Sequence, residues 1–304
     1  MKHWFVQWGE GYLYTPSLIQ KILSFLLLPL SWLYCLIAYV RYRQSRPKFM
    51  GIPVISVGNL TVGGSGKTPV VIELAKQFEK PAIVLRGYGR KSHGMVVVKD
   101  KSTILCDVIK SGDEAMLYAK TLPNATVIVS EIRERGIAEA VSMGCEVVLL
   151  DDGYGKHRID KLDLVIDVET PNRFCLPSGA YREKLWHDKQ VIMLYEGKSF
   201  QRSVSVRNPT AKMVLVTAIA RPERLEPYLP ETIEKVYFED HHFFTPWELE
   251  AIVERTGATS LLVTSKDLVK MSSMNLNLSV LELSLELDET LIKIVKEYAD
   301  AKKD

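Results

Sequence analysis

The feature that most constrains this chain is a glycine-rich segment, T-V-G-G-S-G-K-T, at residues 61–68. An apolar run typical of a strand, V-I-S-V at 54–57, precedes it, and a helical pattern begins near Lys67. In a P-loop, glycines let backbone N–H groups face phosphate oxygens, the lysine reaches the β and γ phosphates, and the threonine ligates magnesium. Thr61 replaces the usual first glycine, but Gly63 and Gly64 can restore the backbone freedom. We therefore predict ATP and Mg²⁺ as cofactors, with a nucleotide site at Thr61, Val62, Gly63, Gly64, Ser65, Gly66, Lys67 and Thr68.

Strand-like runs that are apolar on both faces alternate with helical patterns, which favours a parallel sheet covered by helices. In the first half of the chain, strands are expected at 54–57, 82–85, 126–130, 147–150 and 164–168. A second set is expected at 214–217, 235–238, 261–264 and 280–283, with helices from Arg221, over 246–256 and from Asp288. The predicted fold is α/β, a P-loop NTPase-like domain joined to a smaller α/β domain.

A polar stretch at 201–212 separates the two sets and predicts a domain boundary near residue 205. The expected division is a membrane-associated segment at 1–48, a P-loop kinase domain at 49–205 and a C-terminal lobe at 206–304. Two lobes imply a cleft between them.

Residues 22–40 contain no charged side chain, and a helix over them would extend roughly 28 Å, near the hydrocarbon thickness of a bilayer. Arg41, Arg43, Arg46 and Lys48 follow, which by the positive-inside tendency leaves the remaining chain in the cytoplasm. An interfacial helix and a buried core helix are the alternatives. A spanning helix and an interfacial helix would both place the chain at a membrane, and both predict a hydrophobic or lipid-bound substrate.

Charge and cysteine content exclude some classes of function. There are 39 Lys and Arg against 37 Asp and Glu, so no general field attracts nucleic acid. Cys35, Cys106, Cys145 and Cys175 are scattered without metal-ligand spacing, and we expect all of them to be reduced thiols.

A second phosphate-chemistry element is V-V-L-L-D-D at 147–152. Acids that end a buried strand are placed as in P-loop proteins that hold magnesium, so the predicted metal ligands are Thr68, Asp151 and Asp152. Adjacent side chains of a strand point to opposite sides, so we expect only one aspartate to contact the metal directly. A GTPase is excluded because T264-S-K-D267 has no residue between Lys and Asp, unlike the guanine-reading T-K-x-D element.

Eight motifs together resemble the tetraacyldisaccharide 4'-kinases of lipid A biosynthesis, in order along nearly the whole chain. They are VGNLTVGGSGKTP (57–69), LRGYGRK (85–91), SGDE (111–114), LLDDGY (149–154), LPSGAYRE (176–183), IARPER (219–224), DHHFF (240–244) and TSKDLVK (264–270). The resemblance implies transfer of the ATP γ-phosphate to the 4'-hydroxyl of a tetraacyldisaccharide 1-phosphate, giving lipid IVA. It also implies action at the cytoplasmic face of the inner membrane, with this lipid disaccharide as the partner. We further expect a monomer.

The resemblance also assigns residues. Asp113 is the expected catalytic base and His241 its partner, favoured over His242 by motif register, with Lys67 as the third catalytic residue. The expected substrate-binding residues are Arg86, Tyr88, Glu114 and Arg182. The family usually continues D-D-G with a single residue and Gln-His, whereas this chain has Tyr154-Gly155-Lys156-His157, so Gly155, Lys156 and His157 have no assigned role.

Three hypotheses remain open: this kinase, another membrane-associated P-loop enzyme, and a non-catalytic nucleotide-binding scaffold. The resemblance favours the first. Intact Lys67, Thr68, Asp113, Asp151 and Asp152 argue against the third, because a degenerate site has no need of all five.

Overall fold

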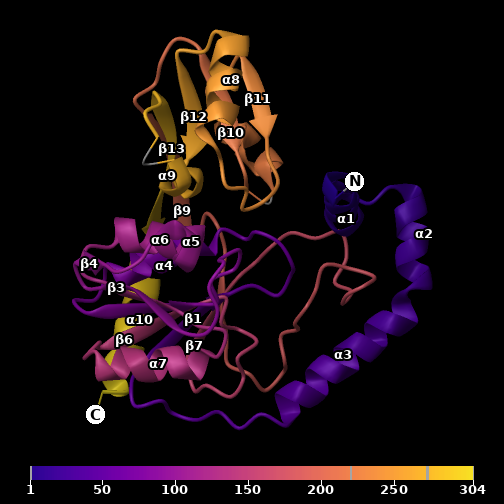
Figure 1. Ribbon diagram of the computed structural model, residues 1–304. Coiled ribbons are helices and arrows are strands. Elements are labelled where there is room, and N and C mark those ends of the chain that lie inside the picture. The colour runs from indigo at the N-terminus through magenta and orange to yellow at the C-terminus, as the bar shows by residue number, and fades with distance from the viewer. Residues whose placement is uncertain (1, 220, 272–273, 304) are drawn as a thin grey trace.

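A computed structural model describes residues 2–219, 221–271 and 274–303, with side chains from residue 8 onward. Two β-sheets with flanking helices form two lobes, and three N-terminal helices extend along one side of the first lobe (Figure 1). The α/β class predicted from the alternation of strands and helices is confirmed.

The first lobe is built on an eight-stranded sheet of order β4-β3-β5-β2-β6-β1-β7-β8. Six strands are parallel, and β3 and β4 add an antiparallel edge. The central strands are buried on both faces, as their unbroken apolar runs predicted. The strands are β1 Val54–Gly58, β2 Pro81–Leu85, β3 Val96–Asp100, β4 Thr103–Ile104, β5 Thr126–Val129, β6 Val147–Asp151, β7 Leu162–Ile166 and β8 Ile192–Leu194.

Helices cover both faces of this sheet. Helices α4 (Lys67–Ala75), α6 (Asp113–Thr121) and α10 (Glu289–Ala301) pack into one apolar core, and α7 (Arg133–Ser142) packs on the opposite face. The short helix α5 (Val108–Ser111) leads directly into α6. The P-loop thus lies between a buried central strand and a helix packed on one face.

The second lobe is a five-stranded sheet of order β11-β10-β12-β13-β9, in which β9 is antiparallel to its neighbour. Its strands are β9 Phe200–Arg207, β10 Met213–Thr217, β11 Glu234–Tyr237, β12 Ser260–Thr264 and β13 Leu278–Leu287, with helices α8 Pro246–Thr256 and α9 Ser265–Met271. The helix expected from Arg221 is a 3-10 helix, η1 Pro222–Tyr228, because its two prolines lack the N–H groups that an α-helix uses.

The polar stretch at 201–212 is largely strand β9, not a linker. Alternate β9 side chains are half-buried and exposed, so the strand carries no apolar run that would reveal it. Strands β9 and β13 join the lobes, since Phe200 and Leu285 pack in the first core while Val204 and Leu281 pack in the second. Helix α10 then returns to the first lobe. The predicted domain ranges stay a prediction.

The continuous helix predicted over residues 22–40 is wrong. Helices α1 (Lys2–Tyr14), α2 (Leu18–Leu26) and α3 (Leu28–Arg43) are separate, and α2 and α3 meet at an angle of 58°. Pro29 lies in the first turn of α3, where a proline is tolerated, whereas inside one long helix it would clash with the preceding turn. In the described ranges, no helix alone has the length and apolarity to cross a membrane, while the bent α2–α3 pair meets that test jointly, by length and composition only.

The expectation of four reduced thiols is also wrong, because Cys35 of α3 forms a disulfide with Cys175. The two residues are 140 positions apart, so local sequence spacing gave no sign of the pair. Cys106 and Cys145 are free thiols. Close by, the Ser31 hydroxyl donates to the Cys175 carbonyl at 2.8 Å, so α3 is fixed to this loop by polar as well as covalent contacts.

Candidate active site

The P-loop has the predicted strand, loop and helix geometry. Strand β1 ends at Gly58, and α4 begins at Lys67 after a turn in which Gly63 and Gly66 have φ angles of 85° and 73°. These left-handed conformations are strained for residues with a Cβ, so the glycines are required by the backbone. The N-terminus of α4 therefore opens toward a phosphate position.

Lys67 is held at the centre of a polar group. Its Nζ lies 3.0 Å from Asn59 Oδ1, 3.2 Å from Ser65 Oγ and 3.4 Å from Asp152 Oδ1. Asn59 is buried and was not predicted; its position just after a buried strand and before the P-loop was the available signal. These contacts orient the lysine that a P-loop uses for phosphates.

Asp152 lies beside two cations. The Arg182 guanidinium donates to Asp152 Oδ1 and, at 3.1 Å, to Asn59 Oδ1. Burial raises the pKa of Asp152, but Lys67 and Arg182 outweigh it and lower the pKa to about 2. Arg182, predicted to bind substrate, therefore lies at the nucleotide side of the site.

Asp151 and Thr68, both predicted metal ligands, hydrogen-bond to the same hydroxyl group, that of Tyr118. Tyr118 of α6 donates to Asp151 Oδ2 at 2.9 Å, and the Thr68 side chain hydrogen-bonds to the same hydroxyl. Burial, together with the charge of Glu114, raises the pKa of Asp151 to about 6. Nothing in the sequence around Tyr118 signalled this contact.

The donor set fits a magnesium ion. Asp151 Oδ1 is buried and has no hydrogen-bond partner among the described residues, as expected of an oxygen that faces a bound ion or its water. Over the same residues, no three His, Cys, Asp or Glu side chains gather as a protein-only metal cage. Magnesium commonly uses one or two carboxylates with substrate phosphates and water, so both observations agree.

Asp113 and His241 come together from different lobes. His241 Nδ1 lies 2.9 Å from both carboxylate oxygens of Asp113, which begins α6. Asp113 is 3% exposed. His242 instead lies 3.4 Å from Glu248 and stacks on Phe238 within the second lobe. The structure thus places His241, and not its neighbour, at Asp113.

Two lysines of α9 also face Asp113. Lys266 Nζ is 3.8 Å and Lys270 Nζ 3.7 Å from Asp113 Oδ2. Burial raises the pKa of Asp113, but the His241 hydrogen bond and the two lysines outweigh it, so the pKa lies below its usual value. Asp113 is therefore an anion at neutral pH, as a base must be.

Two of the three remaining predicted substrate residues, Tyr88 and Glu114, lie beside this pair. The Tyr88 ring is 5.0 Å from the His241 ring and 65% exposed, and Glu114 Oε1 is 3.5 Å from Lys266. Arg86 is exposed, and its charge is felt at Lys156. Tyr88 and Glu114 therefore lie close to the pair, whereas Arg86 lies near Lys156 and Arg133.

The segment that departs from the family pattern has mainly structural contacts. His157 Nε2 is 3.3 Å from Glu183 and its Nδ1 is 3.2 Å from Lys189. A Cβ at Gly155 would lie 2.8 Å from Glu183, so the glycine lets this side chain approach. Lys156 lines a hollow of about 290 Å³ formed by Arg41, Gln44, Ser45, Glu134, Gly155, Lys156, His157 and Arg158.

Arginines of the second lobe reach the P-loop. The Arg224 guanidinium donates to the Gly64 carbonyl, and Arg221 stacks over the Tyr14 ring at 3.9 Å. Both belong to the motif at 219–224, of which Ala220 lies outside the described residues. The sequence did not distinguish these arginines from solvated ones.

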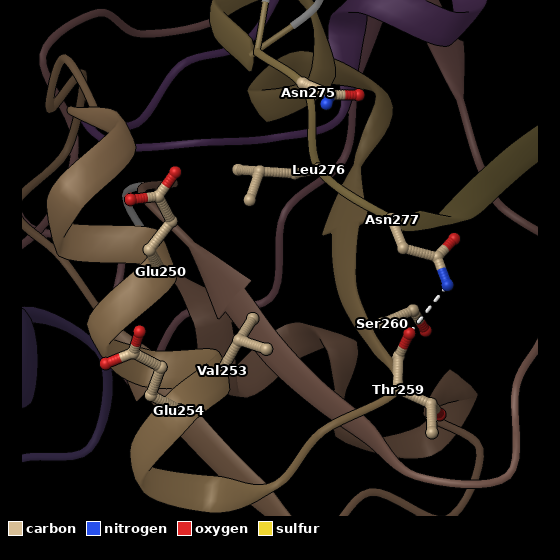
Figure 2. Close-up of a pocket in the computed structure, with 8 residues that line it drawn as sticks. All are labelled: Glu250, Val253, Glu254, Thr259, Ser260, Asn275, Leu276 and Asn277. Carbon is tan, nitrogen blue, oxygen red and sulfur yellow. Dashed lines mark hydrogen bonds between the residues drawn. The ribbon is translucent and has the colours of Figure 1, made fainter.

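A separate pocket of about 250 Å³ lies in the second lobe, between α8 and residues 275–277 (Figure 2). Glu250 and Glu254 line one side, and Asn277 Nδ2 donates to the Thr259 carbonyl at 2.6 Å on the other. It shares no lining residue with the P-loop or with Asp113 and His241. Its acidic lining is unsuited to phosphate.

A P-loop, an acid-ended neighbouring strand and a carboxylate–histidine pair completed by a second lobe define the chain as a P-loop phosphotransferase. The family model described as "Tetraacyldisaccharide-1-P 4'-kinase" matches residues 23–205 and 195–300. The chain belongs to this family, and it is a kinase.

Individual relatives carry the same name as the family. The chain is 44% identical to the tetraacyldisaccharide 4'-kinase of Aliarcobacter butzleri, covering 93% of this chain and 94% of the relative. Identity is 45% to that of Helicobacter acinonychis, with 95% and 94% covered, and 41% to that of Campylobacter jejuni, with 96% and 95% covered. The crystal structure of the "apo" form of LpxK from Aquifex aeolicus in complex with ATP matches with a TM-score of 0.72 at 26% identity, covering 91% of this chain and 99% of that one.

Proposed function

We propose that this kinase transfers the γ-phosphate of ATP to the 4'-hydroxyl of tetraacyldisaccharide 1-phosphate in lipid A biosynthesis, forming lipid IVA. Family membership supports the substrates. The observation that carries the chemistry is the hydrogen bond between Asp113 and His241, which joins a buried carboxylate of one lobe to a histidine of the other. A sugar hydroxyl is a poor nucleophile, so a positioned carboxylate is the group this transfer requires.

In the proposed mechanism, Asp113 accepts the proton of the acceptor hydroxyl as the oxygen attacks phosphorus. His241 Nδ1–H donates to the carboxylate and fixes its orientation. Lys67 and the N-terminal backbone of α4 hold the β and γ phosphates, while Asn59 and Ser65 keep the lysine directed toward them. The bond to the leaving ADP oxygen breaks, and the phosphoryl group passes to the sugar.

We propose Mg²⁺ as the cofactor ion, held by Thr68 and Asp151, with Asp152 close by. The unpartnered Asp151 Oδ1 supports this choice, whereas Asp152 is already engaged by Lys67 and Arg182. When bound, the ion neutralises charge on the transferred phosphate.

We propose that the phosphate of the acceptor lies near Arg86. Burial and the charges of Arg133, Arg86 and Arg41 lower the pKa of Lys156, so four cations share one region with Glu134. Such mutual repulsion is relieved by a bound anion, and arginine suits bidentate phosphate contacts. Tyr88 and Glu114 complete the proposed acceptor site.

We also propose that α2 and α3 attach the chain, as a monomer, to the cytoplasmic face of the inner membrane. Ser24 and Ser31 are buried against residues 175–178, so the polar side of these helices faces the protein. The apolar side is exposed, with at least 40% of each side chain accessible at Leu18, Ile19, Ile22, Phe25, Leu26, Leu30, Trp32, Leu33, Leu36, Ile37, Tyr39 and Val40. A patch of this kind is typical of a membrane surface, and the basic residues after it suit the cytoplasmic side.

The test is a transfer assay with γ-labelled ATP, magnesium and tetraacyldisaccharide 1-phosphate, using detergent-solubilised protein beside Lys67→Ala. We expect labelled lipid from the wild type and strongly reduced label from the variant, because the P-loop lysine acts on the phosphates. ATP binding or hydrolysis without labelled lipid would refute the proposed acceptor and favour another P-loop enzyme.

A further inference from the structure

Lys266 lies where the two lobes meet. It belongs to the first turn of α9 in the second lobe, and its Nζ is 3.5 Å from Glu114 Oε1 and 3.8 Å from Asp113 Oδ2, both on α6 of the first lobe. On its other side, Asp240 Oδ1 lies 3.8 Å away. One ammonium group is therefore shared by carboxylates of both lobes.

Hydrogen bonds to the neighbouring Asp267 fix the position of Lys266 in the second lobe. The fully buried Asp267 accepts hydrogen bonds from Thr217 Oγ1 at 2.6 Å, Thr264 Oγ1 at 2.8 Å and the Ala218 N–H at 3.2 Å. These bonds fix the first turn of α9 to the ends of β10 and β12, and α9 packs against α6. Asp267 is thus a structural anchor, and the lysine before it is aimed at Asp113.

We propose that Lys266 is a positioning residue, which keeps Asp113 ionised and hydrogen-bonded to His241 across the interface between the lobes. The inference rests on the proposed function, because it assigns a role relative to the proposed base. Lys266 belongs to the T-S-K-D-L-V-K motif at 264–270, but neither that motif nor the P-loop pattern assigned it a role.

The charges around Asp113 support the assignment. The groups facing it are His241 from the loop after β11, Lys266 and Lys270 from α9, and Glu114 on its own helix. Lys270 lies nearer to Asp267, at 3.1 Å, than to Asp113. Lys266, by contrast, lies within 3.8 Å of Asp113, Glu114 and Asp240, so all three carboxylates share its charge.

Without Lys266, Lys270 and His241 would still offset part of the Asp113 charge, but the shared cation between Asp113, Glu114 and Asp240 would be lost. Repulsion between like charges favours the protonated form of a carboxyl group. The pKa of Asp113 would rise, and its contact with His241 would weaken as the α6 and loop carboxylates moved apart. Loss of the lysine should thus remove the base at acidic pH while leaving the P-loop unaffected.

The experiment compares kcat as a function of pH in wild type, Lys266→Met and Lys266→Arg, with Lys293→Met as the control because Lys293 is 75% exposed and remote in sequence from the pair. In Lys266→Met we expect the acidic limb of kcat to move up by about one pH unit or more, so that kcat on that limb falls about tenfold and recovers at higher pH. The KM for ATP should stay within about twofold. Lys266→Arg should restore the limb, and the control should match the wild type.

A fall in kcat by the same factor at every pH, or no fall at all, would overturn the proposal. A carbon NMR titration of the Asp113 carboxyl provides a second readout that needs no acceptor lipid. We expect a higher Asp113 pKa in Lys266→Met than in wild type, and an equal pKa would also overturn the proposal. Absence of lipid transfer by the wild type would count against the proposed function alone, since the titration still tests Lys266.

Discussion

At the residue scale, the chemistry depends on side chains whose charge is set by their neighbours. Asp151 and Asp152 are adjacent, yet the pKa of one is raised to about 6 by burial and Glu114, while the pKa of the other is lowered to about 2 by Lys67 and Arg182. Asp152 has a φ angle of 56°, so the chain turns there and directs its carboxylate to the two cations. Two identical, adjacent residues therefore differ in pKa because their neighbours differ.

Replacing Asp113 with Ala should lower kcat by about 10²–10⁴-fold, because general base catalysis contributes roughly that factor. The KM for ATP should change little, since Asp113 contacts His241 and the α9 lysines and not the P-loop. Steady-state transfer kinetics measure both. A large rise in the KM for ATP with kcat unchanged would show that Asp113 acts in nucleotide binding instead.

At the scale of elements, helices α2 and α3 have one side that contacts the protein and one that is exposed. The Ser31 hydroxyl is buried, donating to the Cys175 carbonyl and accepting from the Ser178 N–H at 2.9 Å. Tyr34 donates to the Arg182 carbonyl at 3.2 Å. The helices thus contact the loop that carries Arg182, so the exposed apolar surface of α2 and α3 is connected to the nucleotide site through this loop.

Exchanging Phe25, Leu33 and Ile37 together for Asp should weaken binding to lipid vesicles by at least about tenfold, because charged groups at these positions oppose burial in hydrocarbon. The three side chains are 54–62% exposed, so the melting temperature should hardly change. Vesicle co-sedimentation is the measurement. Ile233→Asp is the matched control, since Ile233 is 50% exposed in the second lobe; equal losses in both variants would exclude a specific membrane surface on α2 and α3.

The disulfide between Cys35 and Cys175 predicts the thiol count. Protein purified and unfolded without reductant should show two free thiols, from Cys106 and Cys145, and four after reduction. Titration with a thiol reagent distinguishes the two states. Four reactive thiols without reductant would mean that α3 and the loop are held by their hydrogen bonds alone.

At the scale of the whole molecule, the last helix of the chain completes the first lobe. Leu291 and Val295 of α10 pack in the core that contains the β1 and α4 side chains, although the β9–β13 ribbon and the whole second lobe come between in the sequence. The second lobe is therefore inserted between two segments of the chain that both belong to the first lobe. Strands β9 and β13 and helix α10 connect the two lobes, and they thereby keep His241 and Lys266 of the second lobe opposite Asp113 of the first.

Leu291→Ala should lower the free energy of unfolding by about 2–5 kcal/mol, the usual range when a buried leucine leaves a cavity. Ile294→Ala is the matched control, because Ile294 is 38% exposed and its loss removes little buried surface. Denaturant unfolding gives both values. Equal, small effects would show that α10 is not part of the first core.

Sequence alone predicted the features that adjacent residues determine. The apolar runs indicated most of the strands, the T-V-G-G-S-G-K-T segment predicted the turn into α4, and the motif order indicated the family. A strand period, a glycine with a left-handed backbone and a lysine after it are all local, so they can be inferred without knowing the rest of the fold.

Tertiary structure decided what depends on residues distant in sequence. The disulfide of Cys35 and Cys175, the place of Arg182 beside Asp152, and the contact of Lys266 with Asp113 each join segments that no short pattern links. Strand β9 was missed because its pairing with β13, not an apolar run, makes it a strand. Burial and charge pairing follow from how the sheets and helices pack together, so these contacts exist only in the folded chain.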